Sequence, residues 1–230
     1  LLRCLPPVII FLAFDLAYFA ANLLKVADGG WFTLLIAALV VLAMGTWQDG
    51  RKALRDLALA GAVPLRAFLA EIATKNPLRV PGTAVFMSLS PQGTPVTLLH
   101  HFKHNKVFHD HVVILSVSSS DIPYVDEADR LDITDLGLGF FRIIAHYGFM
   151  ETPKVPQVMD RARGEGLPID APADTTFFLG RESLLTSGKA RMAGFRKSLF
   201  ALMSRNARPA TAYFGLPPGR VVELGVQVEL

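Results

Sequence analysis

The chain has 230 residues, of which 51% are hydrophobic and 19% charged, and its formal net charge is +3. This composition excludes a disordered segment and a collagen-like repeat, and a single cysteine, Cys4, excludes a disulfide framework. The small net charge, spread along the chain, does not favour nucleic acid as a partner. Only four charged residues fall within 1–47, so the chain has an apolar head and a globular remainder and is not a uniform soluble enzyme.

The first predicted element is an apolar helix over residues 5–24, with the sequence LPPVIIFLAFDLAYFAANLL. Twenty helical residues rise about 30 Å, which is the hydrocarbon thickness of a bilayer. Asp15 near the centre costs about 3 kcal/mol on an insertion scale, whereas each Leu, Ile, Phe or Val returns about 0.3–0.6 kcal/mol. Eleven such residues surround Asp15, so the run predicts a transmembrane helix.

A second apolar run, residues 31–47, holds no charge and is bounded by Trp31 and Trp47. Sixteen helical steps place the two indoles about 24 Å apart, as expected of anchors at two membrane interfaces. Asp28, in the turn between the runs, is a candidate cap for the second helix. We expect a hairpin of two transmembrane helices. A hairpin buried in a soluble core is the alternative, which the lack of a polar stripe disfavours.

Basic residues indicate the orientation of this hairpin. The turn between the runs holds Lys25 against Asp28, and Arg3 precedes the first run. Four basic residues follow the second run, namely Arg51, Lys52, Arg55 and Arg66. The positive-inside rule therefore predicts a multi-pass protein of the cell membrane, with the residues after about 48 in the cytoplasm and the bilayer as a partner.

Asp15 is the one acidic residue within a predicted span, and Tyr18 and Asn22 follow on the same helical face. An intramembrane acid is a candidate for an ion or proton pathway. The alternative, which we favour, is that Asp15 forms a hydrogen bond with a neighbouring helix and fixes packing, with Asn22 as a second candidate for an intramembrane polar contact.

Residues 51–80 are predicted to form an amphipathic linker. Leu65, Phe68, Leu69 and Ile72 share one face of a helix that Asn76 and Pro77 end. Two alternatives stay open: this stretch lies on the bilayer surface, or its helix packs on the domain that follows.

A cytoplasmic α/β domain is predicted over residues 81–230, because short strand-like runs alternate with helical stretches. The predicted strands are 83–89, 111–117, 140–149 and 175–179, and the predicted helices are 96–106, 155–163 and 190–205.

Five of the six histidines lie between residues 100 and 111. His100 and His104 share a helical face, as two zinc ligands can. However, His101 stands where a metalloprotease needs glutamate, and Lys103 and Lys106 repel a cation. We therefore expect a solvated helix end, with a zinc-dependent enzyme as the minority hypothesis.

No other motif indicates catalysis or a cofactor. Gly137 and Gly139 lack the third glycine of a dinucleotide-binding turn, and Gly188-Lys189 lacks the remaining residues of a phosphate-binding loop. His146, alone on an apolar strand, is predicted to be a core residue. The sequence therefore predicts neither an enzyme nor a cofactor.

Five segments together carry a family resemblance: DGGWF at 28–32, RVPGTAVFMS at 79–88, HNKVFHDHVVILSV at 104–117, ETPKVP at 151–156 and RVVELGVQVEL at 220–230. With them the chain resembles, over its whole length, the C-terminal part of the Kup/HAK/KT potassium-uptake transporters.

This resemblance implies that the chain is the end of a longer protein, which imports K⁺ together with protons through a helical bundle with inverted repeats. The ion-coordinating helices of that family come before Leu1, and they are the partners missing here. By analogy, Asp15 is then structural rather than an ion ligand. The cytoplasmic domain is expected to be regulatory or to serve assembly, and a homo-oligomer stays open. A membrane-tethered domain that senses a small ligand, without a direct role in transport, is the alternative.

Overall fold

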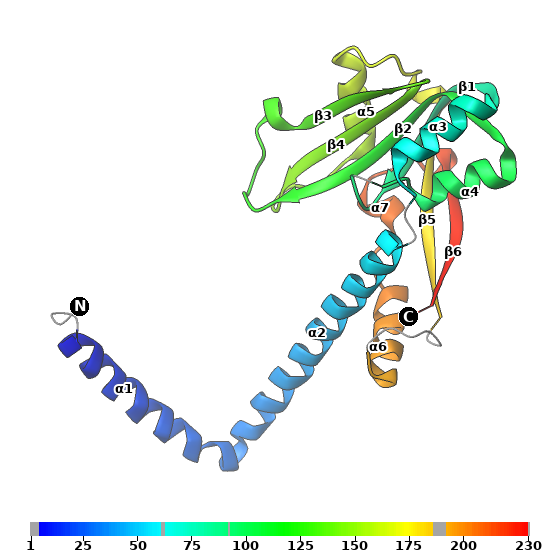
Figure 1. Cartoon of the computed structure of the whole chain (residues 1–230). Coiled ribbons are helices and arrows are strands. Elements are labelled where there is room, and N and C mark those ends of the chain that lie inside the picture. The colour runs from blue at the N-terminus through cyan, green and yellow to red at the C-terminus, as the bar shows by residue number, and fades with distance from the viewer. Residues whose placement is uncertain (1–4, 61–62, 92, 186–191, 230) are drawn as a thin grey trace. The chain divides into compact units, whose positions relative to one another are not determined.

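The computed structural model describes residues 5–60, 63–91, 93–185 and 192–229, and divides the chain into two compact units, Leu1–Asp49 and Gly50–Leu230 (Figure 1). Arg3 and Cys4, used above for orientation and disulfide chemistry, lie outside the described residues, as does the pair Gly188 and Lys189.

The first unit consists of apolar helices. Helix α1 spans Leu5–Leu24, and α2 begins at Trp31 and continues to Ala60. Large apolar side chains of α1, and of α2 as far as Met44, are exposed, from 37% at Leu42 to 78% at Leu24, whereas Leu54 near the end of α2 is 5% exposed. Both helices are long and apolar enough to cross a membrane, and neither apolar stretch is buried within the protein. The two apolar helices are thus as predicted, and a hairpin buried in a soluble core is not found.

The turn between the two helices, Val26–Gly30, is a wide helical turn rather than a capped start. Gly29 adopts a φ of +120°, which favours glycine, and the amide of Gly30 donates to the carbonyl oxygen of Lys25 at 3.0 Å. Asp28 lies inside this turn, so the predicted cap of the second helix is wrong. Helix α2 also extends 13 residues beyond the predicted span: no proline interrupts residues 48–60, and the good helix formers after Gly50 continue the helix.

The second unit contains a six-stranded sheet in the order β3-β4-β2-β1-β5-β6. All neighbouring strands are parallel except β3 and β4, which form an antiparallel hairpin. The strands are β1 (Leu78–Ser88), β2 (Val107–Ser120), β3 (Leu131–Gly137), β4 (Phe140–Gly148), β5 (Thr175–Leu185) and β6 (Val221–Glu229). The α/β class predicted from the sequence is confirmed, and the four predicted strands correspond to β1, β2, β4 and β5.

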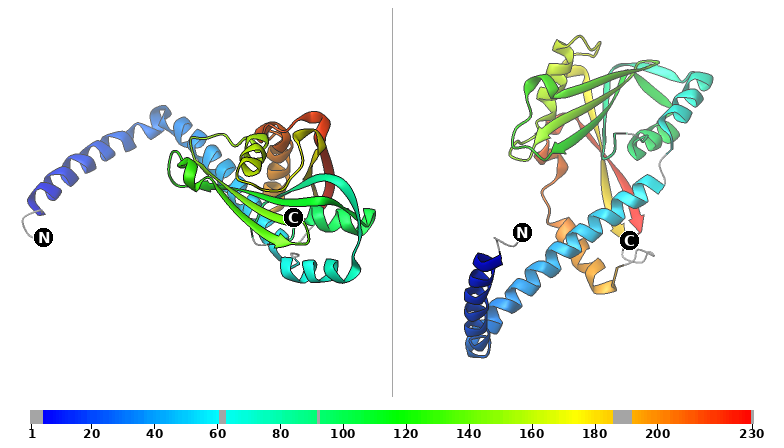
Figure 2. Two further views of the ribbon diagram at one scale, coloured as in Figure 1. Left: turned by 90° about the horizontal axis from the view of Figure 1, so that it is seen from above. Right: turned by 60° about the vertical axis from the view of Figure 1, so that its left-hand side comes forward.

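Helices cover both faces of this sheet (Figure 2). Helices α3 (Leu65–Lys75) and α4 (Val96–Asn105) pack on one face, and α5 (Val155–Gly164) packs on the other. Two further helices, α6 (Gly194–Arg205) and α7 (Ala210–Tyr213), precede β6, and single 3₁₀ turns occur at Glu127–Asp129, Pro172–Asp174 and Pro218–Arg220. The helix predicted over 190–205 therefore begins later, at Gly194 within the described residues.

Helix α3 resolves one of the open alternatives. Leu65, Phe68 and Ile72 are at most 4% exposed and belong to the core between α3, α4 and the sheet. Phe68 contacts the rings of Phe102, Phe108 and Phe140 edge to face at 6.1–6.4 Å. The apolar face of this helix is therefore used by the domain and not by lipid.

The glycine motif at residues 137–139 is a hairpin turn. Gly137, Leu138 and Gly139 have φ values of +79°, +56° and +74°, and they join β3 to β4. A Cβ at Gly139 would lie 2.4 Å from the carbonyl oxygen of Asp110. The two glycines thus serve a tight turn and a close backbone approach.

Candidate functional site

The intramembrane polar residues lie on α1. Asp15 and Asn22 are both exposed, and among the described residues neither side chain has a recorded polar contact. Within the part of the chain that the structure describes, no other polar side chain lies against them, and their role as intramembrane contacts stays a proposal.

The histidine-rich stretch is divided between two elements. His100, His101 and His104 belong to α4, whereas His109 and His111 belong to β2. The rings of His100 and His104 lie 6.0 Å apart on the exposed face of α4. Within the described part of the chain, no group of three or more His, Cys, Asp or Glu side chains is arranged to hold a metal ion.

The prediction of a solvated helix end is wrong for His101. This side chain is 5% exposed, and the centre of its ring lies 5.5 Å from that of Phe86 and 4.9 Å from that of Phe178. Burial lowers the pKa of His101, so its neutral form is favoured. The side-chain amide of Asn105 lies 3.0 Å from its Nδ1 atom. His101 follows Leu98 by three residues, which places both on the inner face of α4.

Two other histidines have carboxylate partners. Nδ1 of His111 lies 3.0 Å from Asp170, whose carboxylate also accepts the hydroxyl of buried Thr83 at 2.7 Å. These contacts, that of His111 foremost, hold the pKa of Asp170 below its ordinary value. Nε2 of His146 lies 2.9 Å from Asp132 on the neighbouring strand. The predicted core position of His146 is therefore wrong: its side chain is 29% exposed and paired on the open face of the hairpin.

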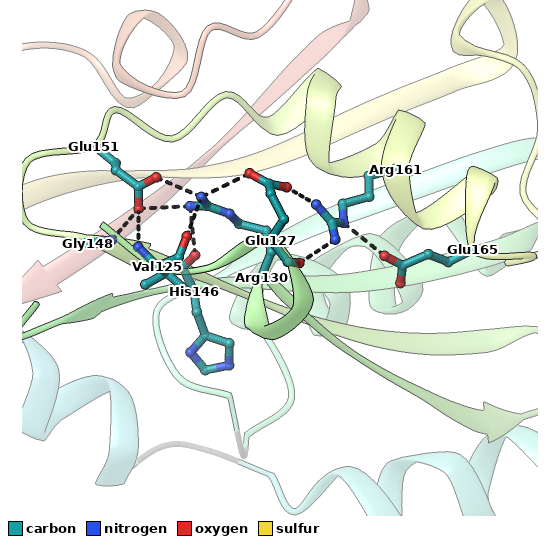
Figure 3. A network of polar contacts seen from close by, with 8 residues as sticks. All are labelled: Val125, Glu127, Arg130, His146, Gly148, Glu151, Arg161 and Glu165. Carbon is teal, nitrogen blue, oxygen red and sulfur yellow. Dashed lines mark hydrogen bonds and ion pairs between the residues drawn. The ribbon is translucent and has the colours of Figure 1, made fainter. Parts of the chain in front are cut away.

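Arg130, which follows the 3₁₀ turn Glu127–Asp129, joins several polar groups of the domain (Figure 3). Its guanidinium binds both carboxylate oxygens of Glu151, at 2.7 and 2.9 Å. It also donates to the carbonyl oxygens of Val125 at 2.8 Å and His146 at 3.2 Å. The residue is 8% exposed and lies 4.8 Å from the ring centre of Tyr147. A bidentate ion pair of this kind fixes both the position and the orientation of the two side chains.

Glu151 completes the connection by accepting backbone amides. Its Oε2 atom accepts the N–H of Gly148 at 2.6 Å and that of Val125 at 3.1 Å. The carboxylate therefore ties the loop after β2 to the loop after β4, and Arg130 closes the pair. We call Arg130 and Glu151 the clasp.

An outer layer of charges extends the clasp to α5. Glu127 contacts Arg130 at 3.3 Å and also pairs with Arg161 of α5, which in turn binds Glu165 at 2.8 Å (Figure 3). Glu127 is 74% exposed and Arg161 30%, so solvent weakens these outer pairs. We therefore expect the clasp to contribute more to the stability of the domain than the outer ion pairs do.

The clasp holds its carboxylate ionised. The hydrogen bond from Arg130, assisted by the Gly148 amide, lowers the pKa of Glu151 from 4.5 to about 2. The same hydrogen bond raises the pKa of Arg130. The arrangement offers neither nucleophile nor free base, and its chemistry is positional: it locks two loops at the carboxyl ends of parallel strands.

This lowered pKa predicts how stability depends on pH. A carboxylate with a lower pKa in the folded state stabilises the domain above its unfolded pKa, and this contribution is lost as pH falls toward the folded value. The difference in unfolding midpoint between the native chain and Glu151→Gln should thus be full above pH 4.5 and shrink between pH 4.5 and about 2. Denaturant titrations at several pH values measure it, and a constant difference across this window would contradict the assignment.

Sequence reasoning missed the clasp. Its two members are separated by 21 residues, and no spacing rule pairs them. The one available signal was Glu151 at the start of the ETPKVP segment, quoted above only for the resemblance.

Comparison with known proteins gives two family matches. Residues 1–52 match a model described as the K⁺ potassium transporter integral membrane domain, and residues 81–230 match the K⁺ potassium transporter C-terminal domain. Both descriptions are of a transporter and not of an enzyme, in agreement with the prediction from the sequence. No solved structure matches.

Individual relatives agree with these models. The chain is 55% identical over 230 residues to "Probable potassium transport system protein Kup 2" of Syntrophobacter fumaroxidans, covering 100% of this chain and 36% of that protein. It is 50% identical to proteins named "Probable potassium transport system protein Kup" in Myxococcus xanthus and "Kup 1" in Geobacter sulfurreducens, covering 98% and 96% of this chain and 34% and 35% of theirs. The chain thus spans about a third of the length of these relatives.

Proposed function

This chain belongs to the Kup family of potassium transporters, and from that membership we propose that it is the C-terminal segment of a K⁺ importer that is coupled to protons. The observation that carries the proposal is the order of parts: exposed apolar helices match the family's integral membrane domain, and the α/β domain matches its C-terminal domain. The transported species would be K⁺ and H⁺.

The orientation belongs to the same proposal. Arg51, Lys52 and Arg55 follow the apolar part of α2 within one helix, which favours a cytoplasmic position for everything after about residue 48. The lipid bilayer and the transporter's other membrane helices are the expected partners, and a homo-oligomer is compatible with this arrangement.

We assign no ion site to this segment. Most of the length of the relatives lies outside the region that the chain covers, and ion sites in inverted-repeat transporters lie at broken helices near the membrane midplane. Helix α1 is continuous from Leu5 to Leu24, so it offers no unwound backbone to an ion.

Complementation tests the transport proposal. The full-length gene should restore growth of potassium-uptake-deficient cells at low external K⁺. Because each H⁺ enters together with K⁺, lowering the pH of the medium should raise the rate of K⁺ uptake. Good membrane expression without restored growth would defeat the proposal.

Asp15→Asn should retain most K⁺ uptake in the full-length transporter. The amide keeps a hydrogen-bonding group on α1 and loses only the charge, so we expect lower expression or stability rather than lost transport. Uptake per molecule in the membrane, measured at several pH values, is the readout. Normal folding together with abolished, pH-insensitive uptake would place Asp15 on the ion pathway.

A second candidate function is a sensor of a small cytoplasmic ligand. In parallel sheets, ligands bind beyond the carboxyl ends of strands where the connections reverse direction, which is here between β1 and β5. Near that edge the buried hydroxyls of Thr94 and Thr97 have no partner among the described residues. Deleting residues 80–230 separates the functions: uptake that persists without regulation favours a sensor, and failed membrane assembly favours a structural part.

A further inference from the structure

Four large apolar side chains are exposed on the two loops that the clasp joins. Ile122 and Tyr124 belong to the loop after β2, and Phe149 and Met150 to the loop after β4. Their exposed fractions are 51%, 64%, 62% and 62%. We call these four residues the loop patch. Exposed apolar side chains that gather at one place mark an interaction site more often than single ones do.

The two loops form one rigid surface. The amide of Phe149 donates to the carbonyl oxygen of Ile122 at 3.0 Å, and that of Met150 donates to Pro123 at 3.2 Å. A Cβ at Gly148 would lie 2.1 Å from the carbonyl oxygen of Pro123, so only glycine permits this approach. The carboxylate of Glu151 binds the amides on either side of the contact (Figure 3). A surface ordered before binding loses less entropy when a partner docks.

The charges beside the loop patch are mostly acidic. The basic groups nearby are Lys154, which is exposed in the loop after β4, and Arg130 and Arg161, which pair with Glu127. Residues 121–129 contain no Lys or Arg, and their four acidic side chains belong to exposed residues: Asp121, Asp126, Glu127 and Asp129. Anionic lipid headgroups attract basic segments and would repel this rim. A second copy docked by a two-fold axis would set the same rim against itself. The charge therefore favours a partner that is both basic and apolar.

We propose that the loop patch docks onto a basic cytoplasmic loop of the transporter's own membrane domain, in the part of the protein outside this chain. The inference depends on the proposed function. Relatives are about three times as long as the chain, and short cytoplasmic loops of membrane proteins are enriched in Lys and Arg. The clasp then acts as a positioning element that holds the four apolar side chains ready for this contact.

Site-specific photocrosslinking in the full-length protein tests the inference. A benzophenone amino acid is placed at Tyr124 or at Phe149 and irradiated in native membrane vesicles, and the adduct is mapped by mass spectrometry. We expect an adduct within the same polypeptide, on a Lys- or Arg-containing loop that precedes residue 1. The same probe at Leu138, which is 52% exposed in the β3–β4 turn, is the control and should give at least fivefold less of this adduct.

Charge reversal supplies a second arm. Asp126→Lys together with Asp129→Lys should lower the adduct yield at least threefold, as should a rise in salt to molar concentrations, because exposed charges are screened. Asp174→Lys, at an exposed acid in the 3₁₀ turn before β5, should leave the yield unchanged. Adducts to lipid, adducts to a second copy, or a yield equal to that at Leu138 would each overturn the inference. Because none of these readouts requires K⁺ uptake, failure here is distinct from failure of the transport proposal.

Discussion

Arg130→Met is expected to lower the free energy of unfolding of the α/β domain by about 1–3 kcal/mol, the cost of leaving partly buried hydrogen-bond acceptors without their donor. Methionine keeps the apolar stem of the side chain but leaves the Glu151 carboxylate without its main partner. The carbonyl oxygens of Val125 and His146 also lose a donor. The loss should appear first in the two clasped loops, where the amides of Val125 and Gly148 should exchange hydrogen faster.

Denaturant unfolding of the purified protein, with hydrogen exchange at those amides, measures this effect. Arg181→Met is the matched control, since Arg181 is 77% exposed and contacts Glu223 at 3.4 Å; an exposed pair of this kind contributes about 0–1 kcal/mol. If both variants changed stability equally, the clasp would carry no special weight. Adding Glu151→Leu to Arg130→Met should not restore stability, because the amides of Val125 and Gly148 would then lack an acceptor.

The parts of the fold that the sequence predicted are those with a strong local period. An uninterrupted apolar run defines α1 and the first half of α2, and the buried strands β1, β2, β4 and β5 are short apolar segments. Strands β3 and β6 were not predicted, because both are sheet edges with many exposed, polar positions. Only pairing with β4 and β5 makes them strands.

The residues of the clasp and the buried histidine were harder to predict, because their environment, like that of the edge strands, is set by distant parts of the chain. The role of Arg130 depends on Glu151 and on carbonyl groups that the fold brings together from distant segments. His101 shows the converse error: a polar neighbourhood in the sequence predicts exposure, whereas the helix turns this one side chain toward Phe86 and Phe178. Tertiary packing decides which side chains pair between elements and which side of a short helix is buried.

Placing arginine at the centre of the second apolar helix should abolish its insertion. Leu39 lies midway between Trp31 and Trp47 and is 56% exposed. Leu39→Arg adds about 3–4 kcal/mol to the apparent insertion free energy, which corresponds to a drop of more than about a hundredfold in the insertion equilibrium. The loss arises from desolvation of a charge, because no side chain of the described residues covers this stretch.

Alkaline extraction of membranes that contain residues 25–230 gives the readout, because without α1 the chain is held in the membrane by α2. The native chain should remain in the membrane pellet, whereas Leu39→Arg should shift a large part into the extract or lead to degradation. Leu57→Arg is the control, since Leu57 is 44% exposed on the same helix but lies beyond the apolar run and beside Arg55. If both variants stayed in the pellet like the native chain, α2 would not cross the bilayer, and the orientation proposed for the α/β domain would lose its basis.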